Sequence, residues 1–203
     1  ILLCGLQHIL DRKLFFLFDL FLLSPETREY HEAKQGEYED DQNDLRDIRS
    51  VHMEAFLRLI GMPTSLKELG CHHNSISELN VRNNTALEYL WCGANRLTAI
   101  DVSTLPNLKE LSCYDNLLAS LDVTHNPELL ELNCYDNSDF TARTIDLSRN
   151  TKLKYLKCSC VNLYELDVSR NTDLETLYCQ YNKLSSLNLS ANTALKDLEC
   201  RVN

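Results

Sequence analysis

The sequence predicts an α/β repeat fold, a right-handed solenoid with parallel strands on its concave face and a helical cap at its N-terminal end. A phrase that begins Leu-x-x-Leu-x-Cys-x-x-Asn recurs through the C-terminal two thirds of the 203 residues. Its first leucine returns every 21 residues, with one interval of 24, at Leu66, Leu87, Leu108, Leu129, Leu153, Leu174 and Leu195. Such a fixed period is typical of solenoids, whose units bury their apolar residues only against neighbouring units.

The full unit reads L-x-x-L-x-C-x-x-N-x-L-x-x-L-D-V-S-x-N-x-x, which is the pattern of a leucine-rich repeat with cysteine at a position usually held by leucine or isoleucine. Residues around Leu-x-Cys are expected to form a short strand in each unit. Alternation along a strand then points Leu69 and Cys71 inward and Glu68, Gly70 and His72 outward. We expect residues 64–203 to form the repeat array.

Seven of the nine cysteines occupy one repeat position, and they are Cys71, Cys92, Cys113, Cys134, Cys158, Cys179 and Cys200. On stacked parallel strands they would lie roughly 4.8 Å apart. A disulfide needs closer Cβ atoms with converging directions, which such a ladder does not offer. We interpret the seven as buried free thiols that act as small apolar side chains, with zinc binding or disulfides as the alternatives.

Polar residues also recur in register. One asparagine column comprises Asn74, Asn95, Asn116, Asn137 and Asn182, and a second comprises Asn84, Asn126, Asn150, Asn171 and Asn192. Val161 interrupts the first column and Leu105 the second. We expect the amides to bond backbone groups that the turns leave unpaired. A column of Asp101, Asp122, Asp146 and Asp167, continued by Asn80 and Asn188, is expected to accept from turn amides on the outer side.

Residues 1–65 lie outside the repeats. The apolar segment 1–24 is interpreted as an export signal or anchor, as a helix that packs on a missing portion of the protein, or as sequence that does not fold here. Residues 25–43 are polar and acidic, which predicts a linker. Residues 44–63 are predicted to form a helical cap, because apolar side chains recur at helical spacing between a capping Asp44 and the terminating pair Gly61 and Pro63.

Repeat four carries three extra residues between Asn137 and Ile145. An insertion at one point of a solenoid is expected to form a surface loop, often on a binding face. The sequence stops at Asn203, inside the seventh unit, so we expect a longer protein truncated at its C-terminus.

The cysteine-bearing unit with its L-D-V-S-x-N tail resembles the 21-residue repeats of the internalin J type, which occur in bacterial surface and secreted leucine-rich repeat proteins. The resemblance covers Leu66 to Asn203. It implies a non-catalytic recognition or adhesion module outside the cell or on its surface, and it does not name a ligand.

Composition excludes several other functions. The net charge of −10 argues against binding to a nucleic-acid backbone and against strong contact of the array with anionic membranes. No nucleophile, phosphate-loop or metalloprotease motif is present, so we expect no enzyme, no cofactor and no metal.

The outward strand positions and the adjoining turn positions are rich in aromatic and acidic residues. The predicted ligand-binding residues are Tyr89, Trp91, Glu110, Tyr114, Asp115, Glu131, Tyr135, Asp136, Tyr155, Tyr178 and Tyr181. Tyrosine and tryptophan dominate the binding energy of many interfaces. We therefore predict a protein ligand on this face. The alternatives are a glycan that stacks on the rings, or a recognition domain attached to an enzyme outside this sequence.

Overall fold

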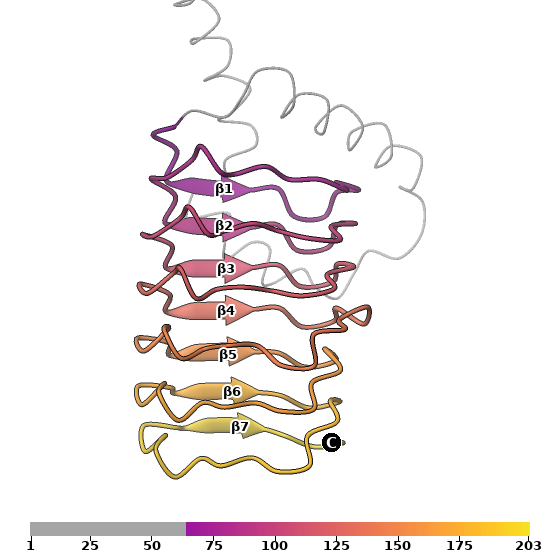
Figure 1. The fold of residues 1–203 in the computed structure, drawn as a ribbon, viewed down its shortest axis with the longest axis vertical. Helices are drawn as coiled ribbons and strands as arrows, with labels where there is room; N and C mark the ends of the chain where they lie inside the picture. Colours follow the sequence, from indigo (N-terminus) through magenta and orange to yellow (C-terminus); the bar gives the residue numbers. More distant parts are fainter. Residues whose placement is uncertain (1–63) are drawn as a thin grey trace, which may run out of the picture. The chain divides into compact units, whose positions relative to one another are not determined.

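The computed structural model describes residues 64–203, so the predicted apolar segment, acidic linker and helical cap lie outside the described residues. The described part is a parallel solenoid with one seven-stranded sheet in sequence order (Figure 1). Its strands are β1 (Glu68–Gly70), β2 (Tyr89–Trp91), β3 (Glu110–Ser112), β4 (Glu131–Asn133), β5 (Tyr155–Lys157), β6 (Thr176–Tyr178) and β7 (Asp197–Glu199). The predicted solenoid with parallel strands is confirmed.

Every strand pairs with the next at the same repeat position. Leu90 pairs with Leu111, and across the longer fourth repeat Leu132 still pairs with Leu156. The three extra residues therefore leave the sheet register unchanged and are accommodated elsewhere in the repeat. A register slip would turn every inward leucine outward, which explains why the sheet tolerates no such shift.

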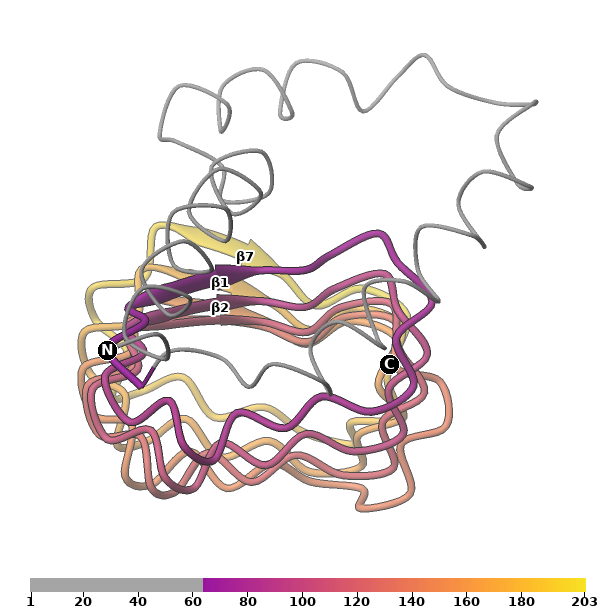
Figure 2. The same cartoon turned by 90° about the horizontal axis from the view of Figure 1, so that it is seen from above.

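Figure 2 shows the strands side by side along one wall, with irregular return segments forming the rest of each coil. Within residues 64–203 these returns contain turns and bends and no helix. Each return is fastened by tight turns of one kind. The amide of Asn126 donates to Val123 O (3.1 Å), and the amide of Leu129 donates to Asn126 O (3.2 Å).

The core is a stack of leucine and cysteine layers. Leu90, Leu111 and Leu132, the central residues of their strands, are fully buried. Six cysteines of the column are buried as free thiols, whereas Cys200 in the last described repeat is exposed. Burial raises the pKa of Cys71 and of Cys134 to about 12, so these thiols stay protonated at neutral pH. The free-thiol interpretation is confirmed for the six buried cysteines.

The first asparagine column ties consecutive repeats together. Asn116 donates through Nδ2 to the carbonyls of Cys92, Cys113 and Tyr114, each at 3.1 Å. Its Oδ1 accepts from the amide of Leu97 in the preceding repeat at 2.9 Å. Repeat five has the buried Val161 in place of the asparagine, and the Oδ1 of Asn182 accepts from the Val161 amide at 3.1 Å.

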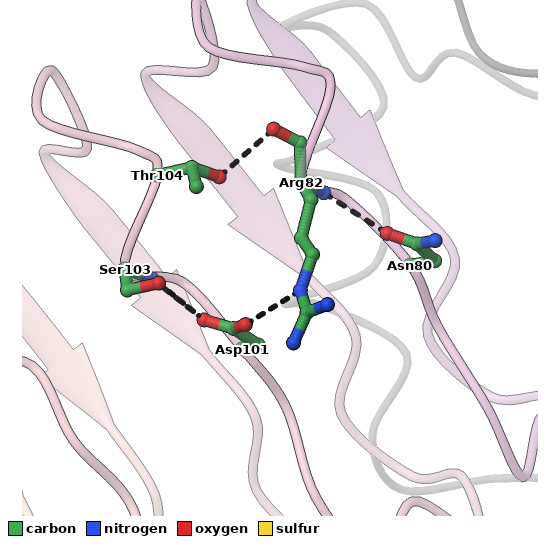
Figure 3. Close-up of polar contacts among 5 residues, drawn as sticks. All are labelled: Asn80, Arg82, Asp101, Ser103 and Thr104. Atoms are coloured by element: carbon green, nitrogen blue, oxygen red, sulfur yellow. Dashed lines mark hydrogen bonds and ion pairs between the residues drawn. The ribbon is translucent and has the colours of Figure 1, made fainter.

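The outer aspartate column behaves as predicted. Asp101 accepts from the amide and the hydroxyl of Ser103 at 3.0 and 2.6 Å. Figure 3 shows that its second oxygen pairs with Nε of Arg82 at 2.7 Å, while Asn80 accepts from the Arg82 amide. The Ser103 hydrogen bonds, and then Arg82, lower the pKa of Asp101 to about 2. The side chains of Asp101 and Asn80 therefore stabilise the turns of the outer side.

The insertion in repeat four is a loop with an anchor. Residues 141–144 are exposed, as predicted, but Phe140 is buried in the core. The amide of Thr141 donates to Ala119 O at 2.9 Å. The prediction that the whole insertion forms a surface loop is therefore wrong for Phe140, which anchors the loop in the core.

Candidate ligand-binding face

The residues that point away from the core along the strands, together with the residue after each ladder cysteine, form a surface that we call the sheet face. The structure brings eight of the predicted residues together on it. Tyr89, Glu110, Glu131 and Tyr155 hold the first strand position, Trp91 and Tyr178 the third, and Tyr114 and Tyr135 the position after the cysteine. Parallel pairing at equal positions places these side chains in columns across the repeats.

The aromatic residues of the sheet face are paired with one another. The rings of Tyr114 and Tyr135 are stacked, with centroids 5.0 Å apart and planes 2° from parallel. Tyr89 and Trp91 also stack, at 5.9 Å. Tyr155 meets Tyr178 edge to face at 6.1 Å. These contacts hold the rings in defined orientations before any ligand binds.

Gly93 makes the room for the tyrosine stack. It occupies the position that holds tyrosine in the next two repeats, and a Cβ placed on it would lie 2.3 Å from the Tyr114 ring. No real Cβ tolerates that distance, so the ring of Tyr114 lies directly over the glycine. Sequence reasoning missed Gly93, although its place in the tyrosine column was a usable signal.

The two ends of the tyrosine stack carry polar partners that sequence reasoning also missed. At one end, the hydroxyl of Tyr114 lies 3.2 Å from Nε2 of His73. At the other, Nζ of Lys157 lies 4.1 Å from the centroid of the Tyr135 ring, which is a cation–π distance. Lys157 is the third residue of β5, so its outward position was readable from the repeat.

Carboxylates lie between the aromatic pairs. Glu110 accepts from Nε1 of Trp91 at 2.6 Å. Glu131 stands next to Glu110 in register, is exposed, and has no hydrogen bond or ion pair within residues 64–203. Two like charges at facing positions of adjacent strands are unfavourable by themselves, and a cation placed between them would relieve the repulsion.

Three predicted residues lie at the margin of this surface. Asp115, Asp136 and Tyr181 follow the strands in a turn where φ is 48°, 56° and 58°. Left-handed backbone favours glycine, asparagine and aspartate, so the turn geometry accounts for the two aspartates without a ligand. Tyr181 is 49% exposed, and the guanidinium of Arg201 lies 5.8 Å from its ring.

Four tyrosines of the sheet face have a raised pKa and so stay protonated at physiological pH. Partial burial raises the pKa of Tyr114, Tyr135 and Tyr155. The hydrogen bond that the Tyr178 hydroxyl donates to Asp197 raises the pKa of Tyr178 to about 12.

Residues 64–203 contain no group of three or more His, Cys, Asp or Glu side chains arranged to hold a metal ion. In the same residues, no helix has the length and hydropathy needed to cross a bilayer.

Solved structures place this architecture among known proteins. The functional domain of InlJ from Listeria monocytogenes, which includes a cysteine ladder, is 39% identical over 70% of this chain, with a TM-score of 0.67. InlF, an internalin from the same organism, is 26% identical over 66% of the chain, with a TM-score of 0.55. A leucine-rich repeat protein of Leptospira interrogans shares the fold at 21% identity over 67% of the chain, with a TM-score of 0.61.

The chain spans about a third of the InlJ structure (32%) and 41% of the InlF structure. No protein-family model and no curated protein sequence matches it. The seven parallel strands, the 21-residue period and the buried thiol column agree with the InlJ likeness in both sequence and structure. Residues 64–203 are therefore a leucine-rich repeat solenoid of the cysteine-ladder type, similar to that of InlJ.

Proposed function

We propose that the solenoid is a protein-binding module that holds a basic partner on its sheet face, in a protein that acts outside the cell or on its surface. The observation that carries the proposal is the set of oriented aromatic pairs around the Glu110 and Glu131 carboxylates. The internalin-type likeness supports a recognition role, because those structures are repeat domains of the same kind.

The fold itself does not require these residues. Inward positions repeat the same side chains, whereas the third strand position changes from repeat to repeat and reads Gly70, Trp91, Ser112, Asn133, Lys157, Tyr178 and Glu199. Outward side chains contribute little to the shared core, so a repeat array can vary them at small cost in stability. A surface built in this way is suited to a specific ligand.

The ring contacts favour a protein partner over a glycan. A sugar stacks on the open face of an aromatic ring, but Tyr114 and Tyr135 cover one face of each other, and Lys157 lies over the Tyr135 ring. Their edges and hydroxyl groups remain available to side chains and peptide groups. Because the rings are already oriented, a partner loses less conformational entropy on binding them.

The charges indicate the chemistry of the partner. Glu131 has no counter-charge in hydrogen-bonding or ion-pair contact within the described residues, and Glu110 stands beside it. An arginine or lysine of the partner would offset the repulsion between the two carboxylates, with Trp91 and Tyr155 flanking the cation. Such a complex should associate faster at low salt, because complementary charge steers encounter.

A displayed library of random peptides, panned against the full chain, tests the proposal. We expect enrichment of sequences rich in arginine or lysine. The enrichment should be lost with a triple variant that combines Trp91→Ala, Tyr114→Ala and Tyr135→Ala. It should be reduced at high salt.

The variant Leu117→Ala, which removes an exposed apolar side chain outside the sheet face, is the matched control and should enrich the same peptides. A glycan array is run in parallel. Glycan binding that disappears in the triple variant, or peptide enrichment that the triple variant leaves intact, would contradict a protein ligand on this face.

A further inference from the structure

A second surface cluster lies outside the sheet face and consists of Arg143, Tyr164 and Lys183, which we call the insertion cluster. The guanidinium carbon of Arg143 is 4.9 Å from the centroid of the Tyr164 ring, and Nζ of Lys183 is 5.3 Å from it. Tyr164 is 41% exposed. The two cations come from the repeats before and after that of Tyr164, so they bracket the ring along the solenoid.

The three-residue insertion builds the first half of this cluster. Its buried Phe140 and the amides of Thr141 and Ala142, which donate to Ala119 O, hold the loop on the scaffold. Past these anchors, Arg143 adopts φ of 63°, and its carbonyl accepts from the Tyr164 amide at 2.8 Å. The loop that projects at the strand-end edge beside β4 in Figure 1 is therefore fastened on both sides of the arginine.

Repeat five supports the same place by departing from the repeat pattern. Val161 replaces the asparagine of the first column, and the next residue, Asn162, takes a left-handed conformation with φ of 57°. Its Nδ2 donates to Ser138 O at the base of the insertion at 2.6 Å. Repeats four and five, which depart most from the repeat pattern, thus contact each other at the base of the insertion. Their aperiodic residues together position the insertion cluster.

The charges of the cluster are uncompensated. Neither Arg143 nor Lys183 pairs with an acid within residues 64–203, although acids outnumber bases 30 to 20 in the whole chain. Six other bases of the array do form ion pairs, and these are Lys67, Arg82, Lys109, Lys152, Lys196 and Arg201. Because they lie 4.9 and 5.3 Å from the same ring centroid, the two cations are at most about 10 Å apart. That is close to the Debye length near physiological ionic strength, so both charges act on a nearby anion.

We propose that the insertion cluster binds carboxylate groups of a short acidic segment on a partner protein. Arginine holds a carboxylate through two parallel hydrogen bonds, while lysine adds a mobile point charge and the Tyr164 hydroxyl a further donor. Both cations already lie at cation–π distance from the Tyr164 ring, which favours an anionic ligand over a neutral sugar. A long sulfated polysaccharide would also be repelled by the net charge of −10 on the chain.

Fluorescence anisotropy at low salt tests this site directly, with a fluorescein-labelled peptide of alternating glutamate and glycine as the probe. We expect the full chain to bind this peptide and to ignore the same peptide with glutamine in place of glutamate. The double variant Arg143→Ala, Lys183→Ala should bind roughly tenfold more weakly. Arg143→Lys should recover part of the loss, because the charge returns without the planar donor pair.

The matched control is the double variant Arg149→Ala, Arg170→Ala, which removes the same charge from exposed positions on the outer turns. It should change the affinity less than twofold. Equal loss in the control, equal binding of the glutamine peptide, or no binding of the glutamate peptide by the full chain would overturn the proposal. So would a heparin fragment that binds the cluster in place of the peptide.

Discussion

Both asparagine columns are mostly buried, yet they hold the solenoid together to different degrees. In the first column, Asn116 uses both ends of its amide, donating to three carbonyls and accepting from the buried Leu97 amide. In the second, Asn150 donates to Val123 O and Asn126 O at 2.9 Å, but its Oδ1 has no partner. The same unpartnered Oδ1 recurs in this column at Asn126, Asn171 and Asn192.

The backbone explains the difference. The carbonyls that Asn150 reaches already accept from backbone amides of the turn, those of Asn126 and Leu129. The Leu97 amide, in contrast, donates to Asn116 Oδ1 and has no other recorded acceptor. The first column therefore accepts from buried backbone amides that have no other acceptor, while the second reinforces turns that the backbone has already closed.

The largest effect is expected for Asn116→Ala. The substitution leaves the buried Leu97 amide without an acceptor, at about 1–3 kcal/mol. The three carbonyls each keep another donor, from Asn95, Asn137 or Ala94. With the packing lost alongside it, we expect the free energy of unfolding to fall by about 2–4 kcal/mol, measured by urea denaturation followed by circular dichroism. A loss below 1 kcal/mol would mean that the first column is dispensable.

Asn150→Ala should cost clearly less, about 1–2 kcal/mol, because both carbonyls keep a backbone donor and an unpaired oxygen is removed with the side chain. The two substitutions delete the same atoms from fully or nearly fully buried sites, so their cavity costs are similar. Comparison of the two urea curves isolates the hydrogen-bond difference. Equal destabilisation would refute the distinction between the columns.

Val161→Asn should have a smaller effect still. It restores the residue that repeat five lacks, in a fully buried position of similar volume. The neighbouring carbonyls of Cys134 and Cys158 already accept from Asn137 and Asn182, so little is gained. We expect stabilisation of less than about 1 kcal/mol. A large destabilisation in the same urea assay would show that the insertion has moved the backbone away from the column geometry.

The smallest effect on stability is expected from acid. Lowering the pH protonates surface carboxylates but leaves the uncharged asparagine columns unchanged. Lys109 and Lys67 lower the pKa of Glu88 from 4.5 to about 2. A lowered folded-state pKa stabilises the fold above pH 4.5, and this contribution disappears as the pH falls toward 2. The difference in urea midpoint between wild type and Glu88→Gln should therefore shrink over that range, whereas that of Asn116→Ala should persist.

Much of the fold was readable because the repeat carries the same information several times. Any one Leu-x-Cys segment is a weak strand signal, but seven copies in one register leave a single pattern of inward residues that satisfies all of them. The asparagine and aspartate columns were predictable for the same reason, because a polar side chain that recurs beside a turn is expected to hydrogen-bond a backbone group of that turn. Asp101 and Asn116 confirm this reasoning.

The candidate site was only partly readable. The aromatic residues of the sheet face could be placed by register, but the pairing of Tyr114 with Tyr135 depends on rotamers and on the absence of a side chain at Gly93. The insertion cluster was missed altogether. Its residues lie in two irregular repeats and a third, where register does not indicate which side chains meet.

The sequence alone determined the solenoid coil, the register of the sheet and the buried columns. The reason is that a leucine or asparagine buried in one repeat has an equivalent buried at the same position of the next repeat. Only the tertiary structure decided how Phe140 anchors the insertion and where Arg143 and Lys183 stand about Tyr164. The physical reason is that periodic positions are constrained by their equivalents in every repeat. Aperiodic positions are constrained only by the particular neighbours that folding brings to them.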